Sequence, residues 1–266
     1  MSDSALGDVK VLDLTNLIAG PYCTKLLADY GAEVIKVERP GIGDGARRLG
    51  PFPGDVPHPE KSGLFLHLNT NKQSVTLNLK TDKGIQVLKS LVKESDVLVE
   101  NFSPRVMASL GLDFESLQRI NPGLVMTSIS NFGQTGPYRD YKAADIVEYA
   151  MGGLMYISGA YDREPLKHAF NQAQFKAGTD AAAATLMATY HQRLTGEGQQ
   201  VDVSIQEAVA TGLRDVVNNF TYSGAVRRRQ PNHSGDLSRL RASADGHLIP
   251  NPGIGAGLNW NTMVEF

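Results

Sequence analysis

Charged, polar and aromatic side chains follow two β-rich segments of the sequence and could form a binding pocket. Arg39 follows the segment 33–38, and Asn101 and Phe102 follow the segment 97–99 after Glu100. Ligands of open α/β sheets bind at the carboxyl ends of the strands, where such loops meet. Two such loops indicate a pocket, although an arginine at this place also fits a side chain that faces water.

The first of these segments invites comparison with dinucleotide-binding proteins. Glu38 ends the second strand of a β-α-β unit, where an acidic residue binds a ribose hydroxyl in NAD-dependent dehydrogenases. The turn at 16–21 reads NLIAGP, however, and lacks the G-x-G-x-x-G pattern that cradles a pyrophosphate. A dehydrogenase therefore stays a remote alternative. The sequence also lacks G-x-x-x-x-G-K-S/T and G-x-S-x-G, which argues against P-loop enzymes and serine hydrolases.

Histidine and cysteine do not occur at the spacing of a metal site. The 6 histidines have no H-E-x-x-H pair and no cysteine at ligand spacing: His58, His67, His168, His191, His233 and His247. We therefore expect no metal cofactor. Cys23 is the single cysteine and lies in a helical segment without a nearby base, so we expect a buried structural thiol and no disulfide.

The first half of the chain alternates between strand-like and helix-like segments. Residues 9–14 and 33–38 are β-rich and flank a helix that Gly31 ends, which predicts a parallel β-α-β unit. A loop with several Gly and Pro residues spans 40–63, and loops of this length commonly serve a ligand. Further strands are expected at 74–79, 97–99 and 124–129, and further helices at 81–94 and 112–120.

The second half is richer in helix. Helices are expected at 143–157, 170–193 and 205–222, with one more strand at 200–204. The run from Ala181 to Ala184 would let another helix or a ligand approach closely. The alternation of strands and helices predicts an α/β fold with a mostly parallel sheet and helices on both faces.

Composition places the chain among ordinary globular proteins. It has 266 residues, of which 41% are hydrophobic and 20% charged, with a formal net charge of -2. This balance gives no general attraction for nucleic acid or an anionic membrane. The N-terminus lacks the pattern of a secretory signal, and no apolar stretch approaches the roughly 20 residues that span a bilayer. We therefore expect a cytoplasmic protein with no nucleic-acid or membrane partner.

Several stretches along nearly the whole chain match one known family. They are VKVLDL at 9–14, AGP at 19–21, LADYGAEVIKVERP at 27–40, NKQS at 71–74, DVLVENF at 96–102, FGQTGPY at 132–138 and TGEGQQVDVS at 195–204. In this order and spacing they resemble the family III CoA-transferases of the CaiB/BaiF type, which include formyl-CoA transferase and carnitine CoA-transferase.

The resemblance implies a fold and a reaction. Members of the family are similar in having a Rossmann-like large domain and a small domain, with two ring-shaped subunits interlocked as a dimer. They move coenzyme A from an acyl-CoA donor to a carboxylic acid acceptor. The partners expected for this chain are therefore an acyl-CoA, a carboxylic acid and a second subunit, which is either a second copy of the chain (a homodimer) or an aspartate-bearing paralog.

Matching positions carry the expected CoA contacts over to this sequence. They are Leu17, Ile18, Ala19, Arg39, Leu77, Asn78, Leu79, Lys80, Asn101, Phe102, Ser103, Lys142 and Asp145. Arg39, Lys80 and Lys142 could pair with the phosphates of CoA, and its adenine could lie on an apolar or guanidinium surface. Lys80 and Lys142 also fit ordinary solvent-facing lysines.

The sequence departs from the family at the catalytic residue. The resemblance implies an aspartate that attacks the thioester, forms a mixed anhydride and then carries CoA as an aspartyl thioester. Alignment through Gly178 and 195–196 places Gln174 at this position. Covalent catalysis of this kind requires a carboxylate. The delocalised lone pair of a neutral amide cannot perform the attack, so Gln174 can only form hydrogen bonds.

Two interpretations of this departure stay open. The first, which we favour, is a non-catalytic subunit of a heteromeric CoA-transferase in which a paralogous chain supplies the aspartate. The second is a CoA-thioester enzyme, whether transferase, isomerase or racemase, that uses another carboxylate. Asp145 and Glu148 are the acids to test, although each also fits a helix surface. Asp180 lies six residues after Gln174, on a different face of a helix, and is a poor substitute.

The chain length is the second feature in which this sequence differs from the family. Family members continue well beyond this point, and residues 244–250 resemble the opening strand of the small domain. Residues 259–261 look like the start of a helix. We therefore expect a large CoA-binding domain at 1–225 and a linker with an incomplete small domain at 226–266, in a truncated chain. Residues 153–156 and the alanine-rich helix could line the acyl cleft, although core packing is the role that we favour for both.

Overall fold

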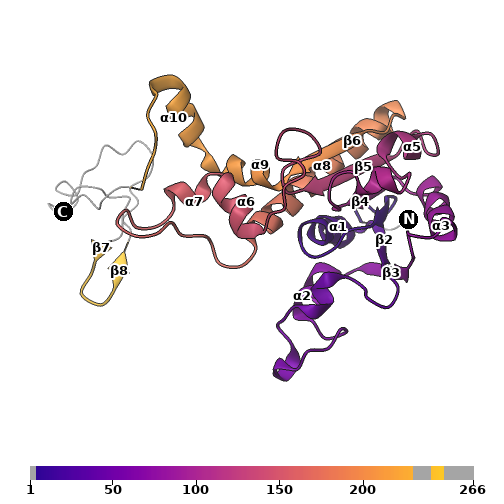
Figure 1. The fold of residues 1–266 in the computed structure, drawn as a ribbon, viewed down its shortest axis with the longest axis horizontal. Helices are drawn as coiled ribbons and strands as arrows, with labels where there is room; N and C mark the ends of the chain where they lie inside the picture. Colours follow the sequence, from indigo (N-terminus) through magenta and orange to yellow (C-terminus); the bar gives the residue numbers. More distant parts are fainter. Residues whose placement is uncertain (1–3, 230–240, 249–266) are drawn as a thin grey trace.

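Parallel β-α-β crossovers build the sheet on which the rest of the molecule is arranged (Figure 1). The computed structural model describes residues 4–229 and 241–248. Its 6-stranded sheet has the order β3-β2-β1-β4-β5-β6. The strands are β1 (Lys10–Asp13), β2 (Glu33–Glu38), β3 (Lys72–Thr76), β4 (Val97–Glu100), β5 (Val125–Ser130) and β6 (Gln200–Ser204), all paired in parallel. The order reverses between β1 and β4, where doubly wound sheets bind ligands.

Helices cover both faces of the sheet, as the sequence predicts. One hydrophobic core lies between the sheet and α1 (Ala19–Asp29), α8 (Gln172–Thr195) and α9 (Ile205–Ala210). The other lies beneath α3 (Asp82–Lys93), α4 (Val106–Ser109) and α5 (Phe114–Gln118). Successive strand residues point to opposite faces, so Val97 and Val99 enter the first core and Leu98 enters the second.

Helix α8 packs closely against α1 because its buried face is made of small residues. That face is mostly alanine, with one glycine. A Cβ atom at Gly178 would lie only 2.6 Å from the carbonyl oxygen of Ala19, a distance that real Cβ atoms do not reach. The hydroxyl oxygens of Thr185 on α8 and Thr127 on β5 are 2.7 Å apart and tie the helix to the sheet. The alanine-rich sequence thus allows close helix packing, as expected.

Several predicted elements occur with shifted ends. The strand expected at 74–79 is instead β3 (Lys72–Thr76), since Asn78 and Thr81 form the turn that begins α3. The Thr81 hydroxyl accepts a hydrogen bond from the Gly84 N–H at 3.1 Å and caps the helix. The helix expected at 112–120 is shortened to α5. Its first turn is capped by Asp113, whose carboxylate accepts from the Ser116 N–H at 2.9 Å.

The segment 40–63 contains more regular structure than the sequence predicts. Two short 3-10 helices, η1 (Gly45–Arg48) and η2 (Pro53–Asp55), interrupt it, and α2 (Gly63–Leu68) begins at its last residue. The Ser62 hydroxyl caps α2 by accepting from the Phe65 N–H at 3.1 Å.

Two long helices expected in the second half are each broken. The segment 143–157 forms α6 (Asp145–Met151) and α7 (Leu154–Ile157), because Gly153 has a φ of +87°. The segment 205–222 forms α9, the 3-10 turn η3 (Thr211–Leu213) and α10 (Asp215–Ser223). Arg214 separates the last two with φ 45° and ψ -107°, which no helix accommodates.

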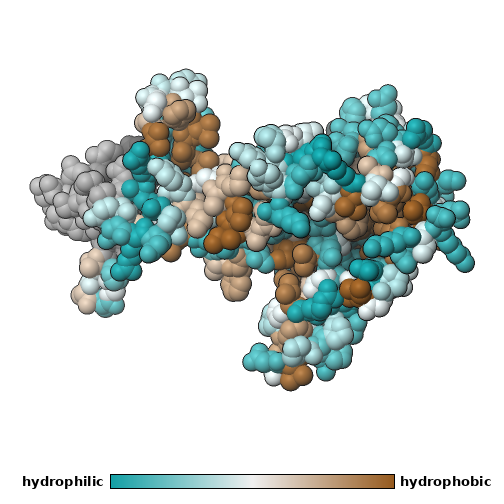
Figure 2. All heavy atoms as spheres, in the orientation of Figure 1, coloured by the Kyte–Doolittle hydropathy of each residue, from teal (hydrophilic) through white to brown (hydrophobic). Residues whose placement is uncertain are grey.

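Helices α6, α7 and α10 extend away from the sheet along the long axis of the molecule (Figure 1). Apolar side chains are exposed on α10, including Val217 and Phe220. Hydrophobic surface is visible over this helix in Figure 2. A hollow of about 430 Å³ lies between α7 and α10 and is lined mostly by apolar side chains. Exposed apolar surface of this kind is typical of interaction sites.

An antiparallel hairpin of β7 (Arg241–Ala242) and β8 (His247–Leu248) lies at the far end of the molecule (Figure 1). It overlaps the segment 244–250, where the resemblance predicts the opening strand of a small domain. The helix expected at 259–261 lies outside the described residues. The division of the chain into 1–225 and 226–266 stays a prediction.

Cys23 is fully buried in α1, as expected of a structural thiol. Burial raises the pKa of its thiol to about 12. Among the helices of the described residues, none combines the length and the apolar character needed to cross a membrane.

Candidate functional site

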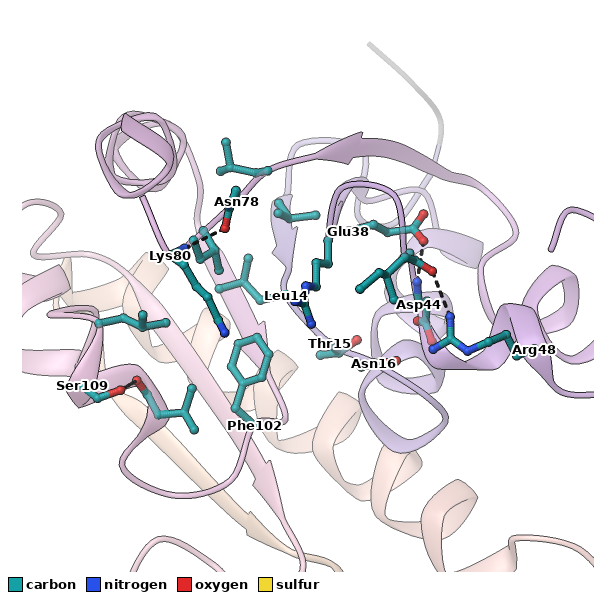
Figure 3. Close-up of a pocket in the computed structure, with 18 residues that line it drawn as sticks. Leu14, Thr15, Asn16, Glu38, Asp44, Arg48, Asn78, Lys80, Phe102 and Ser109 are labelled. Atoms are coloured by element: carbon teal, nitrogen blue, oxygen red, sulfur yellow. Dashed lines mark hydrogen bonds between the residues drawn. The ribbon is translucent and has the colours of Figure 1, made fainter. Parts of the chain in front are cut away.

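A cavity of about 500 Å³ opens where the loops after β1, β2, β3 and β4 meet (Figure 3). It therefore lies at the carboxyl ends of the strands, beside the point where the strand order reverses. Its lining consists of Leu14, Thr15, Asn16, Val37, Glu38, Arg39, Ile42, Gly43, Asp44, Arg48, Leu77, Asn78, Leu79, Lys80, Phe102, Val106, Ser109 and Leu110. Its size is that of a site for a small molecule or cofactor.

The structure brings only part of the predicted CoA contacts to this cavity. Arg39, Leu77, Asn78, Leu79, Lys80 and Phe102 line it. Leu17, Ile18, Ala19, Asn101, Ser103, Lys142 and Asp145 are not among the lining residues. Leu17 to Ala19 and Asn101 directly adjoin lining residues in the chain, whereas Asp145 lies beside Gln174. Lys142 is exposed in the loop before α6.

The turn after β1 is clamped to the loop after β4 by reciprocal hydrogen bonds. The Asn16 N–H donates to Asn101 Oδ1 at 2.8 Å, and Asn101 Nδ2 donates to the Asn16 carbonyl oxygen at 2.8 Å. Asn16 Oδ1 in turn accepts from the Gly45 N–H at 2.6 Å. Asn101 therefore holds in place the Asn16 turn, which lines the cavity, although Asn101 itself is not a lining residue.

The Glu38 carboxylate is hydrogen-bonded to other residues of the protein and is therefore not free to bind a ligand. Its carboxylate accepts from Arg47 Nε and Nη2 at 2.7 Å each, from the Ser74 hydroxyl at 2.7 Å and from the Asp44 N–H at 2.8 Å. Burial opposes ionisation, but these donors prevail and hold the pKa of Glu38 at about 2. The acid that a dehydrogenase would use for a ribose hydroxyl is thus occupied by Arg47.

A buried group of charges supports the cavity wall. Lys36 Nζ lies 2.9 Å from Asp44 Oδ2 and donates to the Thr15 carbonyl oxygen at 2.9 Å. Lys72 Nζ lies 3.1 Å from Asp13 Oδ2. Burial opposes the ionisation of Asp13, but the two lysines hold its pKa well below the usual range. Burial also lowers the pKa of Lys72 to about 8, against the pull of Asp13.

Cationic and apolar side chains share the rim of the cavity. Arg39 and Lys80 are exposed there, and the Arg48 guanidinium donates to the Ile42 carbonyl oxygen at 3.0 Å. Figure 3 shows the Lys80 side chain extending toward the ring of Phe102. Such a rim can hold phosphate groups beside a flat apolar ring system.

Glu100 ends β4 next to the Asn101 clamp and is buried. Its carboxylate accepts from the Phe102 N–H at 2.9 Å. Burial raises the pKa of Glu100 to about 7, and the charge of Asp202 adds to this, while the bonds to Ser128 and Phe102 oppose it. The folded state therefore binds a proton more tightly than the unfolded state between the ordinary pKa of about 4.5 and about 7.

We expect Glu100→Gln to flatten the pH dependence of stability. The stabilising contribution of protonated Glu100 is present below pH 4.5 and is lost as the pH rises through about 7. The variant should therefore lose about 1–3 kcal/mol less than the parent chain between pH 5 and pH 8, measured by urea unfolding. Exposed Glu197→Gln is the control. An unchanged slope in Glu100→Gln would contradict this account.

Gln174 lies in the first turn of α8 and is bound to an acid of α6. Its amide Nε2 donates to Glu148 Oε2 at 2.8 Å. With its own amide oriented to satisfy its neighbours, Asn131 donates to Glu148 Oε1 at 2.9 Å and accepts from the Ala143 N–H at 3.0 Å. Burial raises the pKa of Glu148 to about 7, with Asp145 contributing and the Gln174 hydrogen bond opposing. The structure thus places a weakly acidic carboxyl group at the tip of Gln174.

Asp145 and Glu148 are both buried, so the interpretation of these acids as helix-surface residues is wrong. Helix α8 packs across α6 and covers this face, which the sequence pattern of α6 alone does not reveal. Asp145 accepts from the backbone N–H of Ala173 at 2.9 Å and lies 2.8 Å from Lys167 Nζ. It therefore fixes the start of α8. Asp180 is the acid that the sequence predicts to be a poor substitute for the catalytic aspartate. Its Oδ2 lies 3.6 Å from Lys176 Nζ.

Aromatic side chains lie beside Gln174. The rings of Tyr22 and Phe175 meet edge to face with their centroids 4.9 Å apart, and His67 stacks on Tyr22 at 6.4 Å. Gly178, one turn after Gln174, packs against Ala19 at the start of α1. Direct packing of α1 on α8 thus connects the turn predicted to contact CoA with Gln174, where the resemblance predicts the catalytic aspartate.

Sequence reasoning missed several residues of the cavity and its support. Asp44, Arg47 and Arg48 lie in the segment 40–63, which has no periodicity to assign them. Lys36 could have been found from the sequence, because a lysine inside a β-rich segment is unusual and indicates a buried, paired charge. Its strand β2 pairs with a neighbour on each side. Within residues 4–229 and 241–248, no group of three or more His, Cys, Asp or Glu side chains could hold a metal ion.

Comparisons with known proteins agree on one family. The model of CoA-transferase family III matches residues 6–250. The chain is 39% identical over 243 residues to succinyl-CoA--D-citramalate CoA-transferase of Chloroflexus aurantiacus, covering 91% of this chain and 60% of that protein. It is 41% identical over 204 residues to formyl-CoA:oxalate CoA-transferase of Escherichia coli, covering 77% of this chain and 48% of that protein.

A solved structure is similar over the same region. The CAIB/BAIF family protein from Brucella suis has a TM-score of 0.83 and 33% sequence identity, with 92% of this chain and 65% of that chain covered. The chain thus spans about half to two thirds of the length of these relatives. The matched region includes the whole parallel sheet and the residues around Gln174. The chain belongs to CoA-transferase family III.

Proposed function

We propose that the chain binds an acyl-CoA in the 500 Å³ cavity and takes part in moving CoA to a carboxylic acid. The observation that carries the proposal is the placement of this cavity, at the reversal of strand order, with Arg39 and Lys80 on its rim. The phosphates of CoA pair with these cations, and its adenine lies on apolar side chains such as Leu79 and Phe102. No step in this binding requires a metal.

The acyl donor and acceptor can be narrowed by the relatives. Several are named for succinyl-CoA together with a small dicarboxylic acid, such as glutarate in the mouse and human proteins. We therefore propose succinyl-CoA as the first donor to test, with glutarate and mesaconate as acceptors. Formyl-CoA with oxalate is the second pair, after the Escherichia coli relative.

The carboxylate required for transfer has two possible sources. Gln174 cannot supply it. In a heteromer, an aspartate-bearing paralogous chain would supply it, and the exposed apolar side chains of α10 offer surface for a partner, whether a second copy or a paralog. Alternatively another acid of this chain acts, in a transferase or in an isomerase or racemase of CoA thioesters. The second arrangement is favoured by one specific observation, the hydrogen bond between Gln174 and Glu148.

We expect Arg39→Ala and Lys80→Ala each to weaken the binding of CoA by about 10- to 100-fold, measured by isothermal titration calorimetry at low ionic strength. Each removes one charge-assisted contact to a phosphate, and such contacts contribute about 1.5–3 kcal/mol. Lys83→Ala is the matched control, because Lys83 is exposed on α3 outside the cavity lining. Unchanged affinity in both variants would reject this site for CoA.

A further inference from the structure

We propose that Glu148 takes the place of the missing aspartate: its carboxylate accepts the acyl group and then CoA, while the Gln174 amide holds it by a hydrogen bond. This inference rests on the proposed transfer of CoA. It makes the chain active by itself and replaces the preference for a non-catalytic subunit. In this proposal Glu148 on α6 is the nucleophile. Gln174 on α8 is the neutral side chain that binds it by a hydrogen bond.

Geometry is the first support. Glu148 Oε2 lies 2.8 Å from Gln174 Nε2, so the nearest carboxylate oxygen is one hydrogen bond from the functional group at position 174. A glutamate has one methylene more than an aspartate, and it reaches from α6 toward the start of α8. A carboxylate thus lies within a few ångströms of the place expected for the aspartate, although it comes from another helix.

The second support is that Glu148 lacks the partners of a structural buried acid. In the described part of the chain, no Lys, Arg or His nitrogen lies within 4.0 Å of its carboxylate, whereas the neighbouring Asp145 is paired with Lys167 at 2.8 Å. Its contacts are the amides of Gln174 and Asn131. A glutamine at position 148 could bond to both amides without the cost of burying an ionisable group. A buried acid held only by neutral amides is typical of functional sites.

The Gln174 amide covers one oxygen of the buried Glu148 carboxylate. Glu148 is fully buried, whereas Gln174 is half-buried. In this proposal the Gln174 side chain turns away to expose Oε2 to the thioester, which breaks one hydrogen bond. The weakly acidic carboxyl group, with its pKa of about 7, is a stronger nucleophile once ionised than an ordinary glutamate.

The reaction balances without an additional reagent. A Glu148 oxygen attacks the thioester carbonyl carbon, the C–S bond breaks, and CoA leaves as the thiolate with a mixed anhydride on Glu148. The thiolate then attacks the Glu148 acyl carbon, releases the donor acid as its carboxylate and leaves a glutamyl-CoA thioester. The acceptor carboxylate displaces CoA to form a second anhydride, and the thiolate attacks the acceptor carbonyl. This step releases the new acyl-CoA and restores Glu148.

Covalent trapping tests the assignment. The full chain is incubated with succinyl-CoA or formyl-CoA and then with hydroxylamine, and the modified peptide is located by mass spectrometry. We expect a hydroxamate at Glu148, its loss in Glu148→Gln, and a fall in kcat of at least about 1,000-fold in that variant. Glu148→Gln is isosteric, and circular dichroism checks its fold. Asp180→Asn, on the exposed side of α8, should keep the hydroxamate.

The outcomes separate this inference from the proposed function. CoA that binds in calorimetry while no hydroxamate forms, or while one forms elsewhere, would overturn the role of Glu148 and leave CoA binding intact. Activity that appears only after an aspartate-bearing paralog is added would do the same and favour the heteromer. A chain that fails to bind CoA would overturn both proposals.

Discussion

Replacing Lys36 with methionine is expected to lower the free energy of unfolding by about 3–5 kcal/mol and to abolish CoA binding. Lys36 is buried, and its ammonium group lies 2.9 Å from Asp44 and 3.8 Å from Asp13. Methionine keeps much of the volume but leaves these carboxylates without that charge in an apolar interior. Removing one member of a buried ion pair is costly because the remaining carboxylate loses its charge partner and no water replaces it.

The loss of binding follows from what Asp44 holds. Its carboxylate accepts from the Leu17 N–H at 2.9 Å and from the Ala46 N–H at 2.8 Å, so it fixes the turn after β1 and the start of η1. Both border the cavity. Urea unfolding and calorimetry measure the two effects, with exposed Lys83→Met expected to change stability by less than about 0.5 kcal/mol. A loss below about 1 kcal/mol in Lys36→Met would show that the buried charges are dispensable.

Replacing Gly178 with alanine is expected to lower both the stability of the chain and the yield of the trapped adduct. In Gly178→Ala the new Cβ atom would lie 2.6 Å from the Ala19 carbonyl oxygen and 3.1 Å from the Tyr22 ring, so α8 must move away from α1. Overpacking of this kind costs about 1–3 kcal/mol. Because Gln174 lies one turn away on α8, the same movement should separate it from Glu148 and lower the yield of trapped adduct.

Unfolding in urea and the hydroxylamine assay together measure this prediction. The control is Thr179→Ala at the next position, which is exposed and should keep both stability and adduct yield close to those of the parent chain. Unaltered stability in Gly178→Ala would mean that the helices have room for a methyl group. That result would remove the argument that α1 fixes the position of Gln174.

The sheet could be predicted from the sequence because its signals are local. Residues 9–14 and 33–38 are β-rich, and Gly31 ends the helix between them, so the first β-α-β unit follows from neighbouring residues alone. The helix breaks at Gly153 and Arg214 could not be predicted, because they depend on backbone angles imposed by packing. Apolar periodicity continues through both breaks and therefore favours unbroken helices.

The site was predictable only in part, for a similar reason. Arg39 and Phe102 follow strands, and this placement suffices to bring them to one cavity. The contact between Glu148 and Gln174 joins residues on two helices, and no periodicity of either helix reveals it. The bond between Arg47 and Glu38 crosses an irregular loop and was equally hidden. The resemblance predicts the catalytic position at Gln174, and Glu148 is one of the acids that the sequence indicates for testing, but nothing in the sequence places the two side chains in contact.

The buried thiol of Cys23 can report how often α1 separates from the sheet. It is the single thiol, it has no exposed surface, and its high pKa leaves almost none of the reactive thiolate at neutral pH. An alkylating reagent can modify it only in molecules whose first helix has separated from the sheet. The extent of alkylation over time therefore counts those molecules directly, without any engineered probe.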